Sequence, residues 1–341
     1  MELNKYATPS KWGKYKLYSL TNSQGSRVDI SNLGAIIANF IVLDKNKLPQ
    51  NIVLGYDTPR EYIQGKCYLG CIVGPWANRI DSGSLNIDGI KVQLHQNEEN
   101  NHLHGGSANI GDKCWDVVYV GDNFICLRTS VCKGEAGYPA DIHFNVVYQL
   151  TDANELVIEY NATPDGKTPI NVTQHTYFNL DGSDTILDHS IQIDSETLLI
   201  VDENAIPEAK IKVRETPFDL RQSTVIRDNI SQDDHQLTAA QGFDHCWCFE
   251  PDGIEKFASV SSNINGLTLE VYSDQIGMQF YSGNFLDNEQ GRDGAIYRQH
   301  AGLCLETQCY PNQVNMANSS DCIFEKGETY QHKVIYKVSS K

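Results

Sequence analysis

The chain has 341 residues, a length that suits either one large β-sandwich domain or two domains of average size. Its 44 acidic side chains outnumber the 27 basic ones, and the formal net charge of -17 argues against a nucleic acid or an anionic membrane surface as a partner. Residues 1–15 are polar and lack the apolar core of a signal peptide, and no later apolar run has the length needed to span a bilayer. We therefore expect a cytoplasmic protein that binds a neutral small molecule.

The ten cysteines do not predict a disulfide framework or a zinc motif. None of their spacings gives a paired C-x-x-C pattern, and no export signal accompanies them. Cys246 and Cys248 flank Trp247, so packing on one face of a strand is favoured over metal binding. We expect reduced thiols, several of them buried.

Alternation of apolar and polar residues with a period of two dominates the first half of the chain, and no helical pattern longer than two turns stands out. Short antiparallel strands are predicted at residues 15–20, 35–43, 51–54, 85–87, 90–94, 115–120 and 124–131. Asp88-Gly89 is a strong hairpin signal within this half, because both central residues of such a turn need a positive φ.

The second half continues the same pattern. Residues 143–150 and 156–160 alternate as a hairpin with one solvent-exposed face, whereas residues 202–241 are polar and irregular and predict a surface excursion with a short helix. Further strands are predicted from His245 and at residues 257–261, 267–272, 278–281 and 330–338. No linker or repeat divides the chain, so we expect a single all-β domain over residues 1–341, built as two large packed antiparallel sheets or a barrel-like closure of them.

Residues 173–180, TQHTYFNL, are predicted to form a strand that ends at the turn Asp181-Gly182. His175 is the side chain of this segment that can exchange a proton near neutral pH, and on a strand it would point to the same face as Thr173 and Tyr177. A histidine in such a segment is most often a hydrogen-bonded core residue. A catalytic role requires a partner from elsewhere in the chain.

Five other segments interrupt the alternation with polar side chains among glycines. They are residues 74–80 with Asn78 and Arg79, residues 101–106 with His102 and His104, residues 241–245 with Asp244, residues 278–286 with Gln279, and residues 303–311 with Glu306. Taken singly, most have a plain structural explanation, such as a surface arginine or a turn-capping aspartate. His102 and His104 would share a strand face, a spacing also found among zinc ligands, but a sugar-binding histidine is the favoured functional interpretation. Glu306 stands in an apolar strand, where an unpaired charge is costly, so it needs a partner or a function.

Seven strings occur in one order along nearly the whole chain, six of them in the segments named above and one at residues 134–139. They are ANRI at 77–80, NHLHGG at 101–106, GEAGYP at 134–139, HTYFNL at 175–180, FDH at 243–245, QFYSGNFL at 279–286 and LETQ at 305–308. Together they resemble the galactose mutarotases, also called aldose 1-epimerases. The resemblance implies a large antiparallel β-sandwich of the galactose mutarotase type and the interconversion of α and β anomers of free hexoses such as galactose and glucose.

The resemblance also implies roles for individual residues. His175 would be the general acid and Glu306 the general base, and the expected sugar contacts are Asn78, Arg79, His104, Tyr177, Asp244 and Gln279. Anomer exchange requires a proton to leave the C1 hydroxyl while another reaches the ring oxygen, and a carboxylate with an imidazolium can do both. No metal or cofactor is therefore expected. Because an unperturbed histidine is mostly neutral at pH 7, we expect a nearby carboxylate, that of Asp244 or Glu306, to favour the charged form of His175.

One position departs from the family pattern, and several alternatives stay open. The family commonly has an arginine where this chain has Pro75, which predicts a changed sugar preference rather than changed chemistry. An epimerase of phosphorylated hexoses would need several basic groups, of which Arg79 is one. A sugar-binding module would use His175 and Glu306 as ordinary hydrogen-bond partners, and a glycosidase would also place two carboxylates beside a sugar. The sequence does not decide the preferred hexose or between monomer and homodimer.

Overall fold

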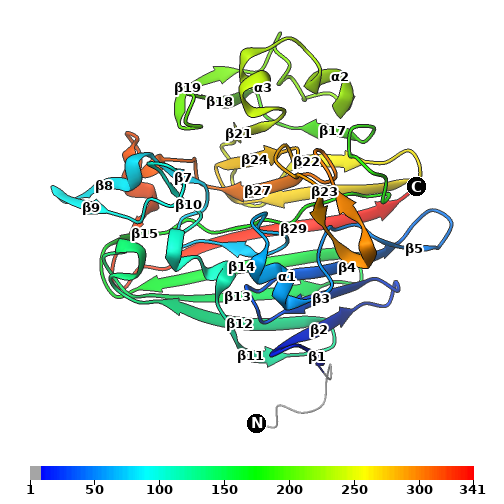
Figure 1. Cartoon of the computed structure of the whole chain (residues 1–341), viewed down its shortest axis with the longest axis horizontal. Helices are drawn as coiled ribbons and strands as arrows, with labels where there is room; N and C mark the ends of the chain where they lie inside the picture. Colours follow the sequence, from blue (N-terminus) through cyan, green and yellow to red (C-terminus); the bar gives the residue numbers. More distant parts are fainter. Residues whose placement is uncertain (1–8) are drawn as a thin grey trace.

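The computed structural model describes residues 9–341 of the chain (Figure 1). The first eight residues of the expected domain, and with them about half of the polar segment examined for a signal peptide, lie outside this range. Within the range, none of the helices combines the length and apolar character that crossing a membrane would require.

Three large antiparallel sheets form most of the molecule (Figure 1). The first has five strands, β1 (Ser10–Trp12), β2 (Tyr15–Thr21), β3 (Arg27–Ser31), β4 (Ile37–Leu43) and β5 (Pro49–Asn51). The second also has five, in the spatial order β19 (Pro207–Lys212), β18 (Thr197–Val201), β21 (Asp244–Cys248), β24 (Gly277–Tyr281) and β27 (Cys304–Gln308). The third has nine, in the order β11 (Asp116–Val120), β12 (Phe124–Val131), β13 (Ile142–Leu150), β14 (Glu155–Pro164), β29 (Tyr330–Ser340), β23 (Leu267–Ser273), β22 (Glu255–Ser261), β17 (Ser190–Ile193) and β20 (Thr224–Val225).

Short two-stranded ladders and helices connect these sheets. The ladders are β6 (Ile72–Val73) with β16 (Thr173–Gln174), β7 (Arg79–Ile80) with β10 (His102–Leu103), β8 (Ser84–Ile87) with β9 (Ile90–Gln93), β15 (Thr168–Pro169) with β28 (Ile323–Phe324), and β25 (Glu289–Gln290) with β26 (Ile296–Tyr297). The α-helices of the described range are α1 (Pro59–Gln64), α2 (Ile226–Ile230) and α3 (His235–Ala240). None of the three exceeds 6 residues, in agreement with the missing helical periodicity.

The nine-stranded sheet packs against both five-stranded sheets. Its strands β12 and β13 contact β2, and Figure 1 shows the blue sheet lying over the green strands. One buried apolar cluster joins side chains from all three sheets, for example Phe40 of β4, Phe144 of β13, Phe257 of β22 and Phe280 of β24. This is the predicted antiparallel β-sandwich, stabilised by burial of the apolar faces of its sheets.

Several local predictions are confirmed. Asp88 and Gly89 both have positive φ, 52° and 81°, and Ile87 faces Ile90 across the hairpin. The irregular region 202–241 contains β19, β20 and the short helices α2 and α3. All ten cysteines are free, and Cys246 and Cys248 are buried together.

The predicted strand over residues 173–180 is wrong for most of its length. A ladder forms only at Thr173 and Gln174, and Phe178 makes isolated bridges to Val53 and Leu303. From residue 175 the segment forms no continuous ladder, although its backbone still pairs locally on both sides. Phe178 exchanges hydrogen bonds with Leu303 at 2.7 and 2.9 Å, and the carbonyl of Tyr177 accepts from the amide of Leu54 at 2.9 Å. The composition of this stretch therefore reflects burial together with isolated pairing rather than one regular strand.

Candidate active site

His175 is positioned by the backbone of a neighbouring loop. Its amide donates to the carbonyl of Cys71 at 2.9 Å, and its carbonyl accepts from the amide of Gly70 at 2.9 Å. With the β16–β6 ladder directly before it, these bonds fix the point from which the imidazole projects. The residue is 5% exposed, so the ring faces the interior of the protein.

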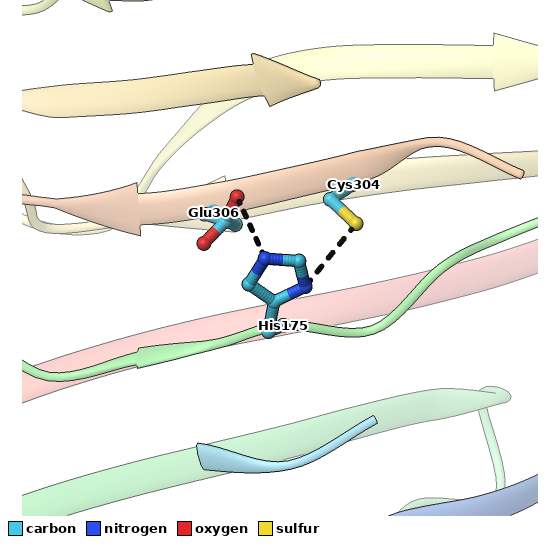
Figure 2. Close-up of side chains that lie close together, drawn as sticks. All are labelled: His175, Cys304 and Glu306. Atoms are coloured by element: carbon cyan, nitrogen blue, oxygen red, sulfur yellow. Dashed lines mark hydrogen bonds and ion pairs between the residues drawn. The ribbon is translucent and has the colours of Figure 1, made fainter. Parts of the chain in front are cut away.

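Glu306 meets His175 from the opposite wall. It lies in β27, opposite Gln279 of β24, and is 2% exposed. Figure 2 shows the carboxylate pointing at the imidazole, with Oε1 of Glu306 3.9 Å from Nε2 of His175. Its second oxygen, Oε2, has no hydrogen-bond partner within residues 9–341. A buried carboxylate oxygen without a donor is costly, and such an atom is a natural place for a ligand hydroxyl to bind.

A pocket of about 290 Å³ opens onto both groups. Its lining residues are Lys66, Cys67, Tyr68, Asn78, Arg79, Glu98, Leu103, His104, His175, Tyr177, Asp244, Tyr281, Phe285, Leu286 and Glu306. All predicted site residues except Gln279 are therefore brought together, from segments that are far apart in the sequence. The volume lies near the small end of the range for ligand pockets, as suits a compact ligand.

Aromatic rings surround the imidazole of His175. Its ring centroid lies 5.2 Å from that of Tyr177, 5.4 Å from that of His104, 5.6 Å from that of Tyr68 and 6.4 Å from that of Tyr281. Tyr177 does share the pocket with His175, as predicted, although a strand is not what aligns them. Rings at these distances shield the imidazole from water and offer an apolar surface to the C–H face of a bound ligand.

Arg79 is oriented by a partner that the sequence did not indicate. Its guanidinium donates from Nε and Nη2 to the two carboxylate oxygens of Glu98, both at 2.6 Å. Such a two-point ion pair holds the planar guanidinium in one orientation, in which its remaining donors are available to the pocket. Asn78 precedes it in a left-handed conformation, φ 63°.

Asp244 and Gln279 form a second polar pair. Nε2 of Gln279 donates to Oδ1 of Asp244 at 2.8 Å, and Asp244 lines the pocket whereas Gln279 does not. Gln279 is 4% exposed and faces Glu306 across the β24–β27 ladder. It stands behind Asp244, where it can orient that carboxylate.

The expectation that His102 and His104 share a strand face is wrong. Strand β10 ends at Leu103, and His104 has a left-handed backbone, φ 50°, which turns it to the pocket. Its Nδ1 accepts from the amide of Asn78 at 3.1 Å. His102 is instead engaged by the carbonyl of His95 at 2.7 Å and the hydroxyl of Tyr138 at 2.9 Å, so both its nitrogens are occupied away from the pocket.

The charge states of His175 and Glu306 differ from those that the sequence predicted. Burial lowers the pKa of His175 to about 4, and burial together with the charge of Asp244 raises the pKa of Glu306 well above its usual range. The prediction that a nearby carboxylate favours the charged form of His175 is therefore wrong. Desolvation of the imidazole outweighs the attraction of Glu306, because burial also favours the neutral form of that carboxyl group. Between these two pKa values the pair holds one proton in total.

Pro75 does not remove its loop from the site. It follows a cis peptide bond, its carbonyl accepts from the amide of Asn171 at 2.7 Å, and Asn78 and Arg79 still reach the pocket. The predicted change in sugar preference stays a prediction.

Sequence inspection missed several residues of the site. Glu98 orients Arg79, the ring of Tyr68 packs near His104 and His175, and Phe285, 57% exposed, stands at the pocket wall. Sγ of Cys304 lies 3.6 Å from Nδ1 of His175. The spacing of Cys304 and Glu306, two apart on one strand, was the available signal for the last of these, since alternate residues share a face.

Comparisons with known proteins point in one direction. Residues 16–337 match the family model described as aldose 1-epimerase. The chain is 39% identical over 336 residues to a galactose mutarotase from Mus musculus, covering 97% of this chain and 96% of that protein. It is 33% identical over 329 residues to an aldose 1-epimerase from Escherichia coli (strain K12), covering 95% of each. A solved structure of a GalM/aldose epimerase homologue from C. elegans has a TM-score of 0.89 at 27% identity, covering 96% of this chain and 99% of that one.

Proposed function

The chain belongs to the aldose 1-epimerase family, and on that basis we propose that it interconverts the anomers of free hexoses with His175 and Glu306 as its acid–base pair. It is a carbohydrate isomerase that acts on aldoses. The observation that supports the residue roles is the meeting of two side chains from distant parts of the chain, 3.9 Å apart in one buried pocket.

The proposed reaction opens and closes the sugar ring. Glu306 removes the proton of the C1 hydroxyl while His175 gives a proton to the ring oxygen, and the bond from C1 to the ring oxygen breaks to leave an aldehyde. Both oxygens are bonded to C1, so two groups this close together can reach them at once. After rotation about the C1–C2 bond the transfers reverse, and the C5 hydroxyl closes the ring on the other face of C1.

The single proton of the pair must sit on His175 when the reaction starts. Burial favours the opposite arrangement, with the proton on Glu306. A C1 hydroxyl that donates to Glu306 would supply the hydrogen bond that Oε2 lacks within residues 9–341 and so favour the carboxylate. We therefore assign the transfer of this proton to the substrate complex, in which the ring oxygen accepts from His175.

The other polar groups of the pocket are assigned to the sugar hydroxyls. Among the lining residues, Asn78, Arg79, His104 and Asp244 offer donors and acceptors, and the ring of Tyr177 offers an apolar face. Gln279 acts through Asp244, to which it donates. Two basic side chains line the pocket, those of Lys66 and Arg79, and Arg79 is already paired with Glu98, so the lining gives weak support to a phosphorylated substrate.

We further propose that residues 1–341 act as a single cytoplasmic domain on free hexoses. Support comes from one apolar core shared by all three large sheets and from ten free cysteines, which suit a reducing compartment.

Polarimetry of freshly dissolved α-D-galactose and α-D-glucose tests this function. The enzyme should speed the approach to the equilibrium rotation for at least one of them and should act poorly on a hexose 6-phosphate. Sugar binding without any acceleration would instead indicate a sugar-binding module, and release of reducing ends from oligosaccharides would indicate a glycosidase.

A further inference from the structure

The cluster in Figure 2 contains a thiol that the isomerase mechanism does not use. Sγ of Cys304 lies 3.6 Å from Nδ1 of His175, and Oε1 of Glu306 lies 3.9 Å from Nε2 of the same ring. The two short distances involve different nitrogens of the ring, and a metal ion would bind only one of them. With one nitrogen of His175, the sulfur of Cys304 and one oxygen of Glu306, all three atoms lie within 4.8 Å of one another. Sugar chemistry needs the imidazole and the carboxylate but gives no reason for a sulfur beside them.

This donor set suits a particular class of metal ion. Thiolate, imidazole and carboxylate together are typical zinc ligands, and bond lengths of about 2.0–2.3 Å place neighbouring ligand atoms of a tetrahedral site roughly 3.3–3.6 Å apart. Because the three atoms lie within 4.8 Å of one another, their separations would need to shorten by at most about 1.5 Å. Such a movement is within reach of side-chain rotation.

Two further observations indicate that a cation could be held here. Oε2 of Glu306 is buried without a partner among residues 9–341, in a residue only 2% exposed, and it belongs to a residue that lines the pocket. A thiolate and a carboxylate would balance the two charges of the ion, so the complex would be neutral in a buried site. The formal net charge of -17 also favours the approach of cations over anions.

We propose that His175, Cys304 and Glu306 form a binding site for a thiophilic divalent cation, with zinc as the ion that fits best, and that its occupation blocks anomer exchange. The second part rests on the proposed function. Binding releases two protons to the solvent, the thiol proton of Cys304 and the one proton that His175 and Glu306 share, and the ion forms bonds to the sulfur, the imidazole nitrogen and the carboxylate. Three protein ligands leave a fourth position open toward the pocket, where the sugar would otherwise bind. The metal would inhibit by occupying both the acid and the base.

Cobalt provides a direct test that does not depend on activity. Addition of Co²⁺ to the metal-stripped full-length protein should produce, at one equivalent, the near-ultraviolet charge-transfer band of a thiolate bound to Co(II), and Zn²⁺ should abolish it. Cys304→Ser should lose the band. Cys67→Ser is the matched control, because its thiol lines the same pocket but lies outside the cluster, and it should keep the band. A wild-type protein without the band, or a Cys304→Ser variant that retains it, overturns the proposal.

A second variant covers the case in which Cys304→Ser does not fold, as judged by circular dichroism. Glu306→Gln replaces one ligand oxygen by an amide of the same shape and should weaken Co²⁺ binding by at least about 10- to 100-fold, the usual loss when even a supporting residue of a metal site is removed. Unchanged binding in Glu306→Gln is a contrary result.

Inhibition is measured separately on each variant, relative to its own rate without metal. Zn²⁺ should halve the mutarotation rate of the wild type at a concentration at least about 100-fold lower than for Cys304→Ser. The two proposals fail in different ways. An active enzyme without the cobalt band refutes the metal site alone, whereas an inactive protein whose band depends on Cys304 supports the metal site and refutes the proposed function.

Discussion

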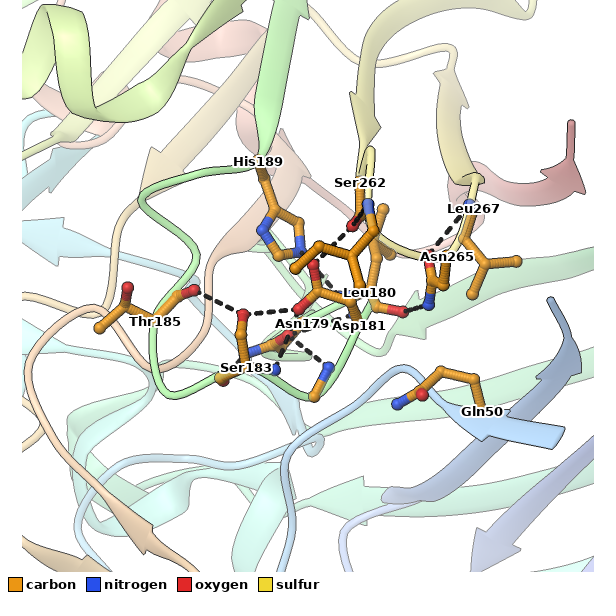
Figure 3. Close-up of polar contacts among 12 residues, drawn as sticks. Gln50, Asn179, Leu180, Asp181, Ser183, Thr185, His189, Ser262, Asn265 and Leu267 are labelled. Atoms are coloured by element: carbon orange, nitrogen blue, oxygen red, sulfur yellow. Dashed lines mark hydrogen bonds and ion pairs between the residues drawn. The ribbon is translucent and has the colours of Figure 1, made fainter. Parts of the chain in front are cut away.

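Two buried carboxylates in this protein each lie 3.9 Å from a histidine nitrogen, yet their surroundings are opposite. The side chains of Glu306 and Asp181 are both 3% exposed, and their partners are His175 and His189. Figure 3 shows Asp181 at the centre of a polar network, in which Oδ1 accepts from the amide and hydroxyl of Ser183 at 3.0 and 2.5 Å. Oδ2 of Asp181 accepts from the hydroxyl of Ser262, whereas Oε2 of Glu306 accepts from no group within residues 9–341.

His189 is also engaged by hydrogen bonds in a way that His175 is not. Nε2 of His189 accepts from the amide of Leu180 at 3.0 Å, so that nitrogen carries no proton and cannot pair with Asp181. Burial would raise the pKa of Asp181, but hydrogen bonds from Ser183 and Ser262 outweigh it and lower that pKa, whereas burial and Asp244 raise the pKa of Glu306. Distance and burial alone therefore do not identify a functional carboxylate–histidine pair. The pair with unsatisfied hydrogen-bonding capacity is the one prepared for a ligand.

Glu306→Gln should have the largest effect on activity of any change to these two pairs. The amide cannot accept the C1 proton, and loss of a positioned base typically costs about 10² to 10⁴ in rate. We expect the loss in kcat to lie near the large end of that range. KM should change by less than about threefold, because glutamine keeps the shape of the glutamate side chain. Polarimetry with galactose or glucose measures both. A variant that keeps wild-type kcat would falsify the base assignment.

Asp181→Asn should lower stability and leave catalysis nearly unchanged, the opposite of Glu306→Gln. The amide replaces an oxygen that accepts from Ser183 or Ser262 by a donor, and leaving those groups unsatisfied should lower the free energy of unfolding by about 2–3 kcal/mol. The catalytic constants should stay within about twofold, because the network lies outside the pocket. Urea denaturation and polarimetry on the same sample check both. Loss of activity at unchanged stability would contradict the distinction between the two carboxylates.

The pH dependence of kcat/KM should report the shifted pKa values of His175 and Glu306. The rate should fall about tenfold per pH unit below pH 4, where His175 takes up the second proton, and should fall again only above the raised pKa of Glu306. An alkaline limb that begins near pH 6.5 would mean an unperturbed histidine and would contradict the assignment. Asp181→Asn should leave the profile unchanged.

Stability should depend on pH in opposite directions through the two carboxylates. The lowered pKa of Asp181 contributes stability that is present above its ordinary value and is lost as the pH falls through the lowered one. The raised pKa of Glu306 contributes stability that is present at low pH and is lost as the pH rises through the raised value. Circular dichroism at each pH of the rate profile keeps unfolding separate from catalysis.

Glu98→Gln should have a smaller effect on catalysis than Glu306→Gln, and the effect should fall on KM rather than on kcat. An amide can hold Arg79 at one point but not as an ionised two-point partner, so the guanidinium loses orientation toward the sugar. We expect KM to rise about tenfold with kcat within threefold. Glu99→Gln, at the exposed neighbouring position outside this pocket, is the control and should leave KM unchanged. Equal effects from both substitutions would indicate a general charge effect.

Much of the fold could be predicted from the sequence because its signals are local. The period of two in residues 143–150 follows from one buried face of a strand, and the hairpin at Asp88-Gly89 follows from the positive φ that both residues adopt. The string HTYFNL indicated a family but was only partly right as a secondary-structure signal, since its residues pair through isolated bridges and not through a continuous ladder.

The tertiary structure alone decided the properties of the site. The sequence contains His175, Glu306 and Asp181 as ordinary titratable residues, and it gives no sign that Glu98 would orient Arg79. The spacing of Cys304 and Glu306 indicates a shared strand face, but not that this face meets an imidazole. Desolvation and hydrogen bonding depend on which distant segments pack around a group, so pKa values and unsatisfied atoms have no local sequence signal. For this reason the identity of the acid–base pair could be inferred from its family motifs, whereas its protonation and its difference from the Asp181–His189 pair could not.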